Sequence, residues 1–205
     1  MALVKYNNNS ISAVTSTGLA TGSLVPIKTL TASSSATLSF VHGTDGVVLD
    51  STYPIYKFEF INIHPATDGA FFTFNLSSDS GSNYNVTKTT TLFQAYHNEA
   101  DSATALTYRV DDDLAQSTSF QYLSADMDND NDSCLVGILH LFNPSSTTFV
   151  KHFLANTNLV FNSAMSVEEF IAGYGNTTSA INGVRFQMSS GNIDSGTIKL
   201  YGIGD

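Results

Sequence analysis

Charged side chains are scarce in this sequence. They make up 13% of the 205 residues, against about 25% in an ordinary globular domain. The 8 lysines and arginines are outnumbered by 18 aspartates and glutamates, which gives a net charge of −10 at pH 7. Nucleic acid carries closely spaced negative phosphates and would repel such a chain. We therefore expect no nucleic-acid partner, and we interpret the acidity as a contribution to solubility.

Cysteine, tryptophan and long apolar runs are also missing or nearly so. Cys134 is the one cysteine, so no disulfide can form within the chain, and we expect it to pack as a small buried side chain. Without tryptophan, the Cys–Trp–Cys pattern of an immunoglobulin sandwich is absent. No apolar run approaches the roughly 18 residues that span a membrane, and the first residues lack the apolar core of a signal peptide. We expect no membrane association.

What the chain does contain is apolar, β-favouring and turn-favouring residues. Apolar residues reach 42%, and Ser, Thr and Asn fill the polar positions, as suits strands and turns. Short alternating runs are separated by turn signals every 8 to 15 residues or so, which favours antiparallel pairing. We predict an all-β fold, an antiparallel β-sandwich that is jelly-roll-like. The predicted strands are 24–30, 36–41, 55–63, 70–76, 86–96, 105–110, 119–123, 133–142, 147–153, 181–188 and 197–203.

Five more specific expectations concern these runs. Residues 55–63 form the clearest central strand, with Tyr56, Phe58 and Phe60 on one face and Ile55, Ile61 and Ile63 on the other. Residues 70–76 are expected to pair with it across a five-residue turn, and 147–153 to pair with 133–142. Residues 24–30 contain a proline, which suits an edge strand. Residues 166–173 are the one helical candidate, because Ser166 precedes two glutamates in a near capping-box pattern.

The chain divides into two parts by composition. Residues 1–23 are rich in Asn, Ser, Thr, Ala and Gly and cannot build a core alone. They are predicted to be an N-terminal arm, either a loose tail or an attachment segment that orders on a neighbouring subunit. Residues 24–205 are predicted to form the β-sandwich domain.

Residue patterns that carry chemistry are few. No G-x-S-x-G nucleophile elbow is present, and the five histidines have no metal-binding spacing. Glu59 lies in the middle of a predicted strand beside aromatic neighbours, which suggests a buried pair. We predict no catalytic residues, no bound cofactor and no enzymatic activity.

The sharpest local motif is the acidic run of residues 126–132, which alternates four aspartates. Such side chains can converge on calcium, which prefers six to eight oxygen ligands. The match to an EF-hand loop is incomplete, because the sixth position is Asn131 rather than Gly and the twelfth is Gly137 rather than Glu. A calcium loop and a solvated acidic turn both remain open. The candidate metal ligands are Asp126, Asp128, Asp130 and Asp132.

Three stretches resemble virion structural proteins of tailed bacteriophages, marine or cyanophage-like. They are VRFQMSSGNIDSGTIKLYG at 184–202, YKFEFINI at 56–63 before a Pro-x-x-Asp-Gly turn, and FNPSS at 142–146. The resemblance covers roughly residues 50–205. It implies a β-sandwich of capsid decoration, head-fibre or tail-fibre type, commonly a homotrimer, and it carries no catalytic residues.

The function that this resemblance implies is a capsid decoration, cement or head-appendage protein that binds the outer capsid surface. The chain has no shaft, heptads or repeats, which suits a compact module. Its partners would be phage capsid or tail proteins, and it would be made in the host cytoplasm and located in the virion. Two alternatives remain open, namely a tail-fibre-type module that recognises a host surface glycan and, more remotely, a polysaccharide depolymerase.

Overall fold

A computed structural model describes residues 24–204 of the chain. These residues form two antiparallel sheets packed on one apolar core, and no helix is present among them. The all-β sandwich is therefore confirmed. The predicted N-terminal arm, residues 1–23, lies outside the described residues.

The two sheets differ in size. The larger has eight strands in the order β1 (Leu24–Ser35), β12 (Ile193–Ile203), β3 (Ile55–Pro65), β8 (Leu135–Phe142), β9 (Lys151–Phe161), β10 (Met165–Gly175), β5 (Lys88–Asn98) and β6 (Thr104–Tyr108). The smaller has four, in the order β2 (Leu38–Val41), β11 (Gly183–Met188), β4 (Phe72–Ser77) and β7 (Gln121–Tyr122).

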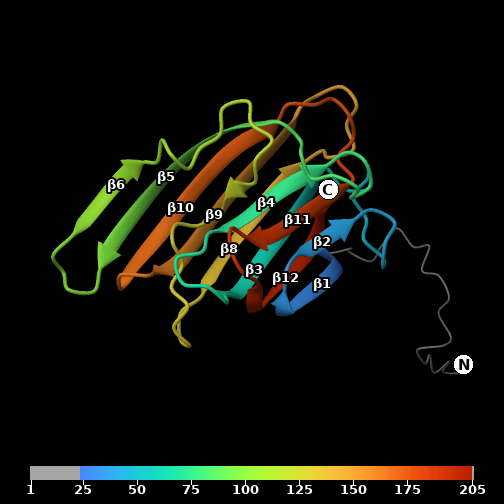
Figure 1. The fold of residues 1–205 in the computed structure, drawn as a ribbon. Coiled ribbons are helices and arrows are strands. Elements are labelled where there is room, and N and C mark those ends of the chain that lie inside the picture. Colours follow the sequence, from blue (N-terminus) through green and yellow to red (C-terminus); the bar gives the residue numbers. More distant parts are fainter. Residues whose placement is uncertain (1–23, 205) are drawn as a thin grey trace, which may run out of the picture.

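Eight of the strands follow jelly-roll connectivity. Strands β1, β12, β3 and β8 lie side by side in one sheet, and β2, β11, β4 and β7 lie side by side in the other. The remaining four strands are two inserted hairpins, β5–β6 between β4 and β7, and β9–β10 between β8 and β11. Both hairpins add to the same sheet. We call these four strands the extension; they reach beyond the smaller sheet in Figure 1.

Aromatic side chains join the two sheets. Phe186 of β11 lies with its ring centroid 5.3 Å from that of Phe58 and 5.3 Å from that of Phe60, both on β3. Its ring also lies within 6.3 Å of those of Phe40, Phe72 and Phe74 on its own sheet. All of these rings are buried. Such edge and offset contacts add stability beyond area burial alone.

The assignment of residues 70–76 as the hairpin partner of 55–63 was wrong. β3 pairs with β12 and β8, whereas β4 belongs to the other sheet and pairs with β11 and β7. The two strands face each other across the core instead, as the 5.2 Å contact between Phe60 and Phe72 shows. In a jelly roll, consecutive strands cross between sheets, and a short turn alone does not reveal this.

The helix predicted at 166–173 was also wrong. These residues lie within strand β10, which pairs with β9 on one side and β5 on the other along its full length. Val167, Glu169 and Ile171 point inward and are buried. Phe170 points outward, so the apparent apolar pair of Phe170 and Ile171 is divided between the two faces of a strand. Pairing on both edges outweighs the weak local helix signal.

A β-bulge corrects the predicted faces of β3. Tyr56, Phe58 and Phe60 point into the core as predicted, but the register shifts around Asn62, whose φ is 51°. Ile63 therefore turns inward and is fully buried, away from the face that carries Ile61. Gly196 lies opposite with φ of 119°, and a Cβ there would meet the Asn62 carbonyl oxygen at 2.6 Å.

Other predictions hold with shifted bounds. Strand β3 is central, β1 lies at a sheet edge, and β8 pairs with β9 as a hairpin. β9 begins at Lys151, later than predicted, and runs on to Phe161. The strand predicted at 119–123 is reduced to the two residues of β7.

Truncating the aromatic contact between the sheets tests this account of the core. Phe186→Ala is expected to lower the free energy of unfolding by about 3–5 kcal/mol, because it removes a buried ring and leaves a cavity. Chemical denaturation measures the change. Phe149→Ala is the matched control, since Phe149 is 72% exposed, and it is expected to change stability by less than about 0.5 kcal/mol. Equal losses in the two variants would contradict the account.

Candidate functional site

The outer face of the extension is the most distinctive surface of the described residues. Strand alternation turns Phe93, Leu106, Tyr108, Leu154 and Phe170 to this face. Leu106 is 71% exposed and Leu154 is 51% exposed. We call these five residues the outer patch. A strand face that packs on nothing normally carries polar side chains, so this apolar set needs an explanation.

Cross-strand pairing organises the outer patch. Phe93 lies directly opposite Tyr108 on β6 and opposite Phe170 on β10. The Phe93 and Phe170 rings stack with their centroids 4.9 Å apart and an interplanar angle of 9°. The Tyr108 hydroxyl donates a hydrogen bond to Asp113 Oδ2. The patch is therefore ordered by its own contacts as a preformed surface.

Apart from Asp113, which accepts the Tyr108 hydrogen bond, formal charge is almost absent from the strand positions around the outer patch. Among the outward positions of β5, β6, β8, β9 and β10, Glu168 is the only Asp, Glu, Lys or Arg. Its Oε1 accepts a hydrogen bond from the Asn156 side chain at 3.1 Å. The chain carries a net charge of −10, so two copies repel each other electrostatically. This repulsion would be smallest if the outer face of one extension met the outer face of another.

A depression of about 510 Å³ adjoins the outer patch. Leu154 belongs to both, and the other outward residues that line it include His152, Tyr174, Phe142 and Thr91. His152 and Tyr174 are directly opposite across β9 and β10, with ring centroids 5.9 Å apart. The lining is mainly apolar and aromatic, with hydroxyl and imidazole groups available for hydrogen bonds.

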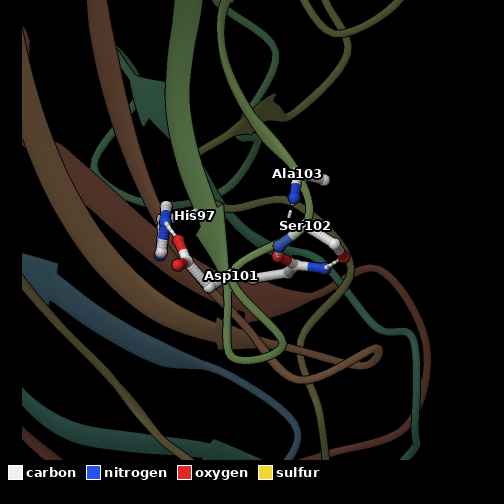
Figure 2. Close-up of polar contacts among 5 residues, drawn as sticks. His97, Asp101, Ser102 and Ala103 are labelled. Carbon is white, nitrogen blue, oxygen red and sulfur yellow. Dashed lines mark hydrogen bonds and ion pairs between the residues drawn. The ribbon is translucent and has the colours of Figure 1, made fainter.

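A tight turn holds the edge strand β6 in place. The Asn98 side-chain oxygen accepts hydrogen bonds from the backbone N–H groups of Ser102 and Ala103, each at 2.9 Å. His97 and Asp101 form an exposed pair at 3.2 Å beside it. Figure 2 shows the two side chains reaching toward each other at the base of the turn. The pair is too exposed to add much stability, so the Asn98 bonds are the principal local support.

The inner face of the extension is covered partly by the smaller sheet, where Phe74 of β4 and Phe153 of β9 have ring centroids 4.9 Å apart, and partly by the chain that follows β6. The segment after β6 runs beside β5, where Thr90 N–H donates to Leu114 O and Lys88 N–H donates to Ser117 O. Farther on, Thr157 Oγ1 on β9 donates to Leu123 O. We call residues 109–127 the covering segment. Because irregular chain brings unpaired backbone groups, polar side chains line this layer.

Lys88 and Gln121 are fully buried members of this polar layer. Lys88 Nζ donates to Asn75 Oδ1 at 2.5 Å and to Val86 O at 2.9 Å. Burial lowers the pKa of Lys88 to about 7. Gln121 accepts a hydrogen bond from Thr90 Oγ1 and donates one to Asp112 O, which ties the covering segment to β5.

A second buried group lies around Glu169, which is 1% exposed on the inner face of β10. Burial raises its pKa to about 7; the positive charge of Arg109 opposes this shift and the negative charge of Asp112 adds to it. Arg109 Nε donates to Asp112 Oδ2 at 2.7 Å. Burial also raises the pKa of Asp126. The Arg109 guanidinium thus bonds to Asp112 and acts on Glu169 and Asp126 through its charge alone.

The four aspartates predicted to bind calcium do not converge. Asp126 interacts with the charges of Arg109 and Asp112. Asp128 is already used within the turn, where its two oxygens accept from Asp130 N–H and Ser133 Oγ, each at 3.0 Å. Within residues 24–204, no three His, Cys, Asp or Glu side chains come close enough to hold a metal ion. The geometry adds no support to the calcium loop, which stays a prediction.

Two smaller expectations have clear outcomes. Cys134 is only partly buried, with its sulfur 3.8 Å from Asn62 Oδ1, so it was wrong to expect full burial. Glu59 is paired, since Lys57 Nζ donates to its Oε1 at 2.7 Å, but both side chains are partly exposed, so the suggestion of a buried pair was wrong. The described residues include no helix that is long and apolar enough to cross a membrane.

Sequence reasoning missed both the outer patch and the buried carboxyl group. The alternation of 166–174 would have revealed Glu169 as an inward residue, but the same residues were assigned to a helix. Leu106 and Tyr108 share a face in any strand, yet nothing local shows that the face lacks a covering sheet.

Comparison of the chain with protein-family models, characterised proteins and solved structures finds no match. The function is therefore argued from the geometry together with the sequence resemblance.

The buried Lys88 amine predicts how stability depends on pH. Its pKa is about 7 in the folded chain against the ordinary 10.5, so the unfolded chain binds more protons between these values and stability rises with pH across this range. The contribution is on the order of 4 kcal/mol. The Lys88→Met variant lacks the amine. Its free energy of unfolding, measured from pH 7 to 10.5, should therefore lack this rise.

Lys28→Met is the control for this measurement, because it removes a lysine from the edge strand β1. It is expected to keep the wild-type slope. A Lys88→Met variant whose stability changes with pH in parallel with the wild type would show that the Lys88 amine is not buried in this way.

Proposed function

We propose that this chain is a non-enzymatic structural protein of a tailed-phage virion, which assembles as a homotrimer and binds the outer capsid surface. The observation that carries the proposal is the outer patch. It presents Phe93, Leu106, Tyr108, Leu154 and Phe170 on an almost uncharged sheet face. Contiguous exposed apolar residues of this kind mark association surfaces.

The composition of the outer patch agrees with this role. Aromatic residues are enriched at protein interfaces and charged residues are depleted at interface centres. The stacked Phe93 and Phe170 rings need little further ordering on association, which reduces its entropic cost. We assign the patch to contacts between copies of this chain, because the negative charge of each copy lies largely elsewhere.

The edge strand β6 supports the same assignment. It is five residues long, pairs only with β5, and contains neither proline nor charge. Exposed edges of this kind usually carry such protective features, because they can pair with other chains. A neighbouring subunit that covers the outer patch would also shield this edge. The sequence resemblance supplies the virion setting and the trimeric state.

Light scattering on the full chain tests the association. The wild type is expected to have three times the mass of the 22.0-kDa chain. Leu106→Asp combined with Leu154→Asp should weaken association at least roughly 30-fold, the effect of losing about 2 kcal/mol at an interface centre. The variant should still fold, since both side chains are largely exposed, as circular dichroism would verify.

Leu24→Asp is the matched control, because Leu24 is an exposed leucine on the opposite edge strand, β1. It is expected to leave the mass unchanged. A monomeric wild type, or equal weakening by the control, would refute the assignment. Capsid binding is checked on purified virions that contain the Leu106→Asp, Leu154→Asp variant. If the variant occupies these virions as fully as the wild type does, capsid binding does not depend on association of the chain through the outer patch.

The depression beside the outer patch favours one second candidate, a module that binds a host surface glycan. Sugars stack on aromatic rings and bond to hydroxyl and imidazole groups, and Tyr174 and His152 offer both. If this is correct, a glycan array probed with the wild type will show ligands whose binding falls at least roughly 10-fold in Tyr174→Ala. No binding at high protein concentration would exclude this candidate.

A further inference from the structure

Two buried oxygen atoms without hydrogen-bond partners belong to directly paired residues on strands β5 and β10. They are Glu169 Oε2 and Gln94 Oε1. The two residues are direct cross-strand partners on the inner face of the extension, where Cβ atoms are about 4.5–5.5 Å apart. Glu169 is 1% exposed and Gln94 is 7% exposed. Each orphaned acceptor would cost about 1–3 kcal/mol of desolvation, so a donor between them is expected.

The charges around this pair decide which donor fits. Arg109 from the end of β6 and Asp112 from the covering segment both act on Glu169. Asp126, farther along that segment, is coupled to the same two residues. The remaining neighbour in the row is Thr157 on β9, which is not charged. Arg109 bonds to Asp112, with no ion pair to Glu169. An ionised Glu169 would therefore add a second buried negative charge beside Asp112.

We propose that Glu169 is a neutral carboxylic acid in the folded protein, with its proton on Oε2 and donated to Gln94 Oε1. One proton satisfies both orphaned atoms at once. A metal ion is a poorer occupant, because no group of three metal-ligating side chains exists within residues 24–204 and the Arg109 guanidinium is nearby. The acid–amide bond joins the centres of β5 and β10.

Loss of this proton would act on the covering segment. The new carboxylate would compete with Asp112 for the Arg109 guanidinium, whose bond to Asp112 holds the start of the segment. The buried β5–β10 pair would also lose its hydrogen bond. We call the proton-dependent hydrogen bond between Glu169 and Gln94 the latch. It joins β10 to β5 within the extension, its loss would also disturb the covering segment, and it is independent of the proposed virion role.

The sign of the pH effect follows from the two protonation states. The unfolded chain releases the Glu169 proton near the ordinary value of 4.5, whereas burial keeps the folded pKa near 7. The folded state therefore binds more protons between these values, and its stability falls as pH rises through them. The unfolding equilibrium constant should increase on the order of 100-fold from this group alone.

Glu169→Gln tests the latch, because its amide can donate to Gln94 Oε1 at every pH. Denaturation between pH 4.5 and 8 should show the wild type losing stability relative to this variant, and the variant should be the more stable protein at pH 8. Glu168→Gln is the control, since Glu168 is the adjacent residue on the outer face. It is expected to follow the wild type. A Glu169→Gln variant that also follows the wild type would overturn the proposal.

A direct titration separates the proton from a purely structural role. The side-chain carboxyl carbon resonance of Glu169, assigned by its loss in Glu169→Gln, should titrate with a midpoint near 7. In Gln94→Met the acid loses its acceptor, so the midpoint should move down. A midpoint near 4.5 in the wild type would overturn the neutral acid. A midpoint that Gln94→Met leaves unchanged would overturn the bond to Gln94.

Discussion

The unequal size of the two sheets is the constraint on which the rest of the structure depends. The jelly-roll strands of both sheets cover one another through the rings around Phe186. The hairpins β5–β6 and β9–β10 lengthen only one sheet, so the smaller sheet opposes only part of the extension, around the contact of Phe74 with Phe153. The rest of its inner face is covered by the chain that follows β6. The polar layer on the inner face follows from this asymmetry, and the two added hairpins supply the strands that carry the outer patch.

The two faces of the extension solve different physical problems. Much of the inner face is closed by the covering segment, which is irregular apart from β7 and whose backbone groups need partners. Gln121 of β7 and Thr157 of β9 therefore lie where a sandwich core would hold apolar residues. Burying ionisable groups there is costly unless they become neutral, and Lys88 and Glu169 both shift in that direction. The outer face has the opposite composition, apolar and almost free of charge. A surface of this kind is expected to be covered in the working protein.

The sequence predicted the fold class, most strands and the hairpin of β8 with β9, because alternation and turn residues are local signals. It did not predict strand partners across the core, since pairing in a jelly roll joins strands distant in the chain. The helix predicted at 166–173 was wrong for the same reason. The weak capping pattern is a local signal, whereas the strands that pair with these residues on both sides are distant in the chain. That error concealed the difference between Glu168 and Glu169, one outward and one inward. The outer patch was not predicted, because alternation shows that Leu106 and Tyr108 share a face but not whether that face points toward the core.

The central claim is that the outer face of the extension is covered in the assembled protein. Hydroxyl-radical footprinting with mass spectrometry measures this directly, by recording how fast exposed side chains are oxidised as the protein is diluted. The account predicts that Phe93, Tyr108 and Leu154 react slowly in the concentrated protein and faster on dilution, whereas Leu24 on the opposite edge reacts at one rate throughout. Oxidation of the outer patch at a rate independent of concentration, and as fast as that of Leu24, would contradict it.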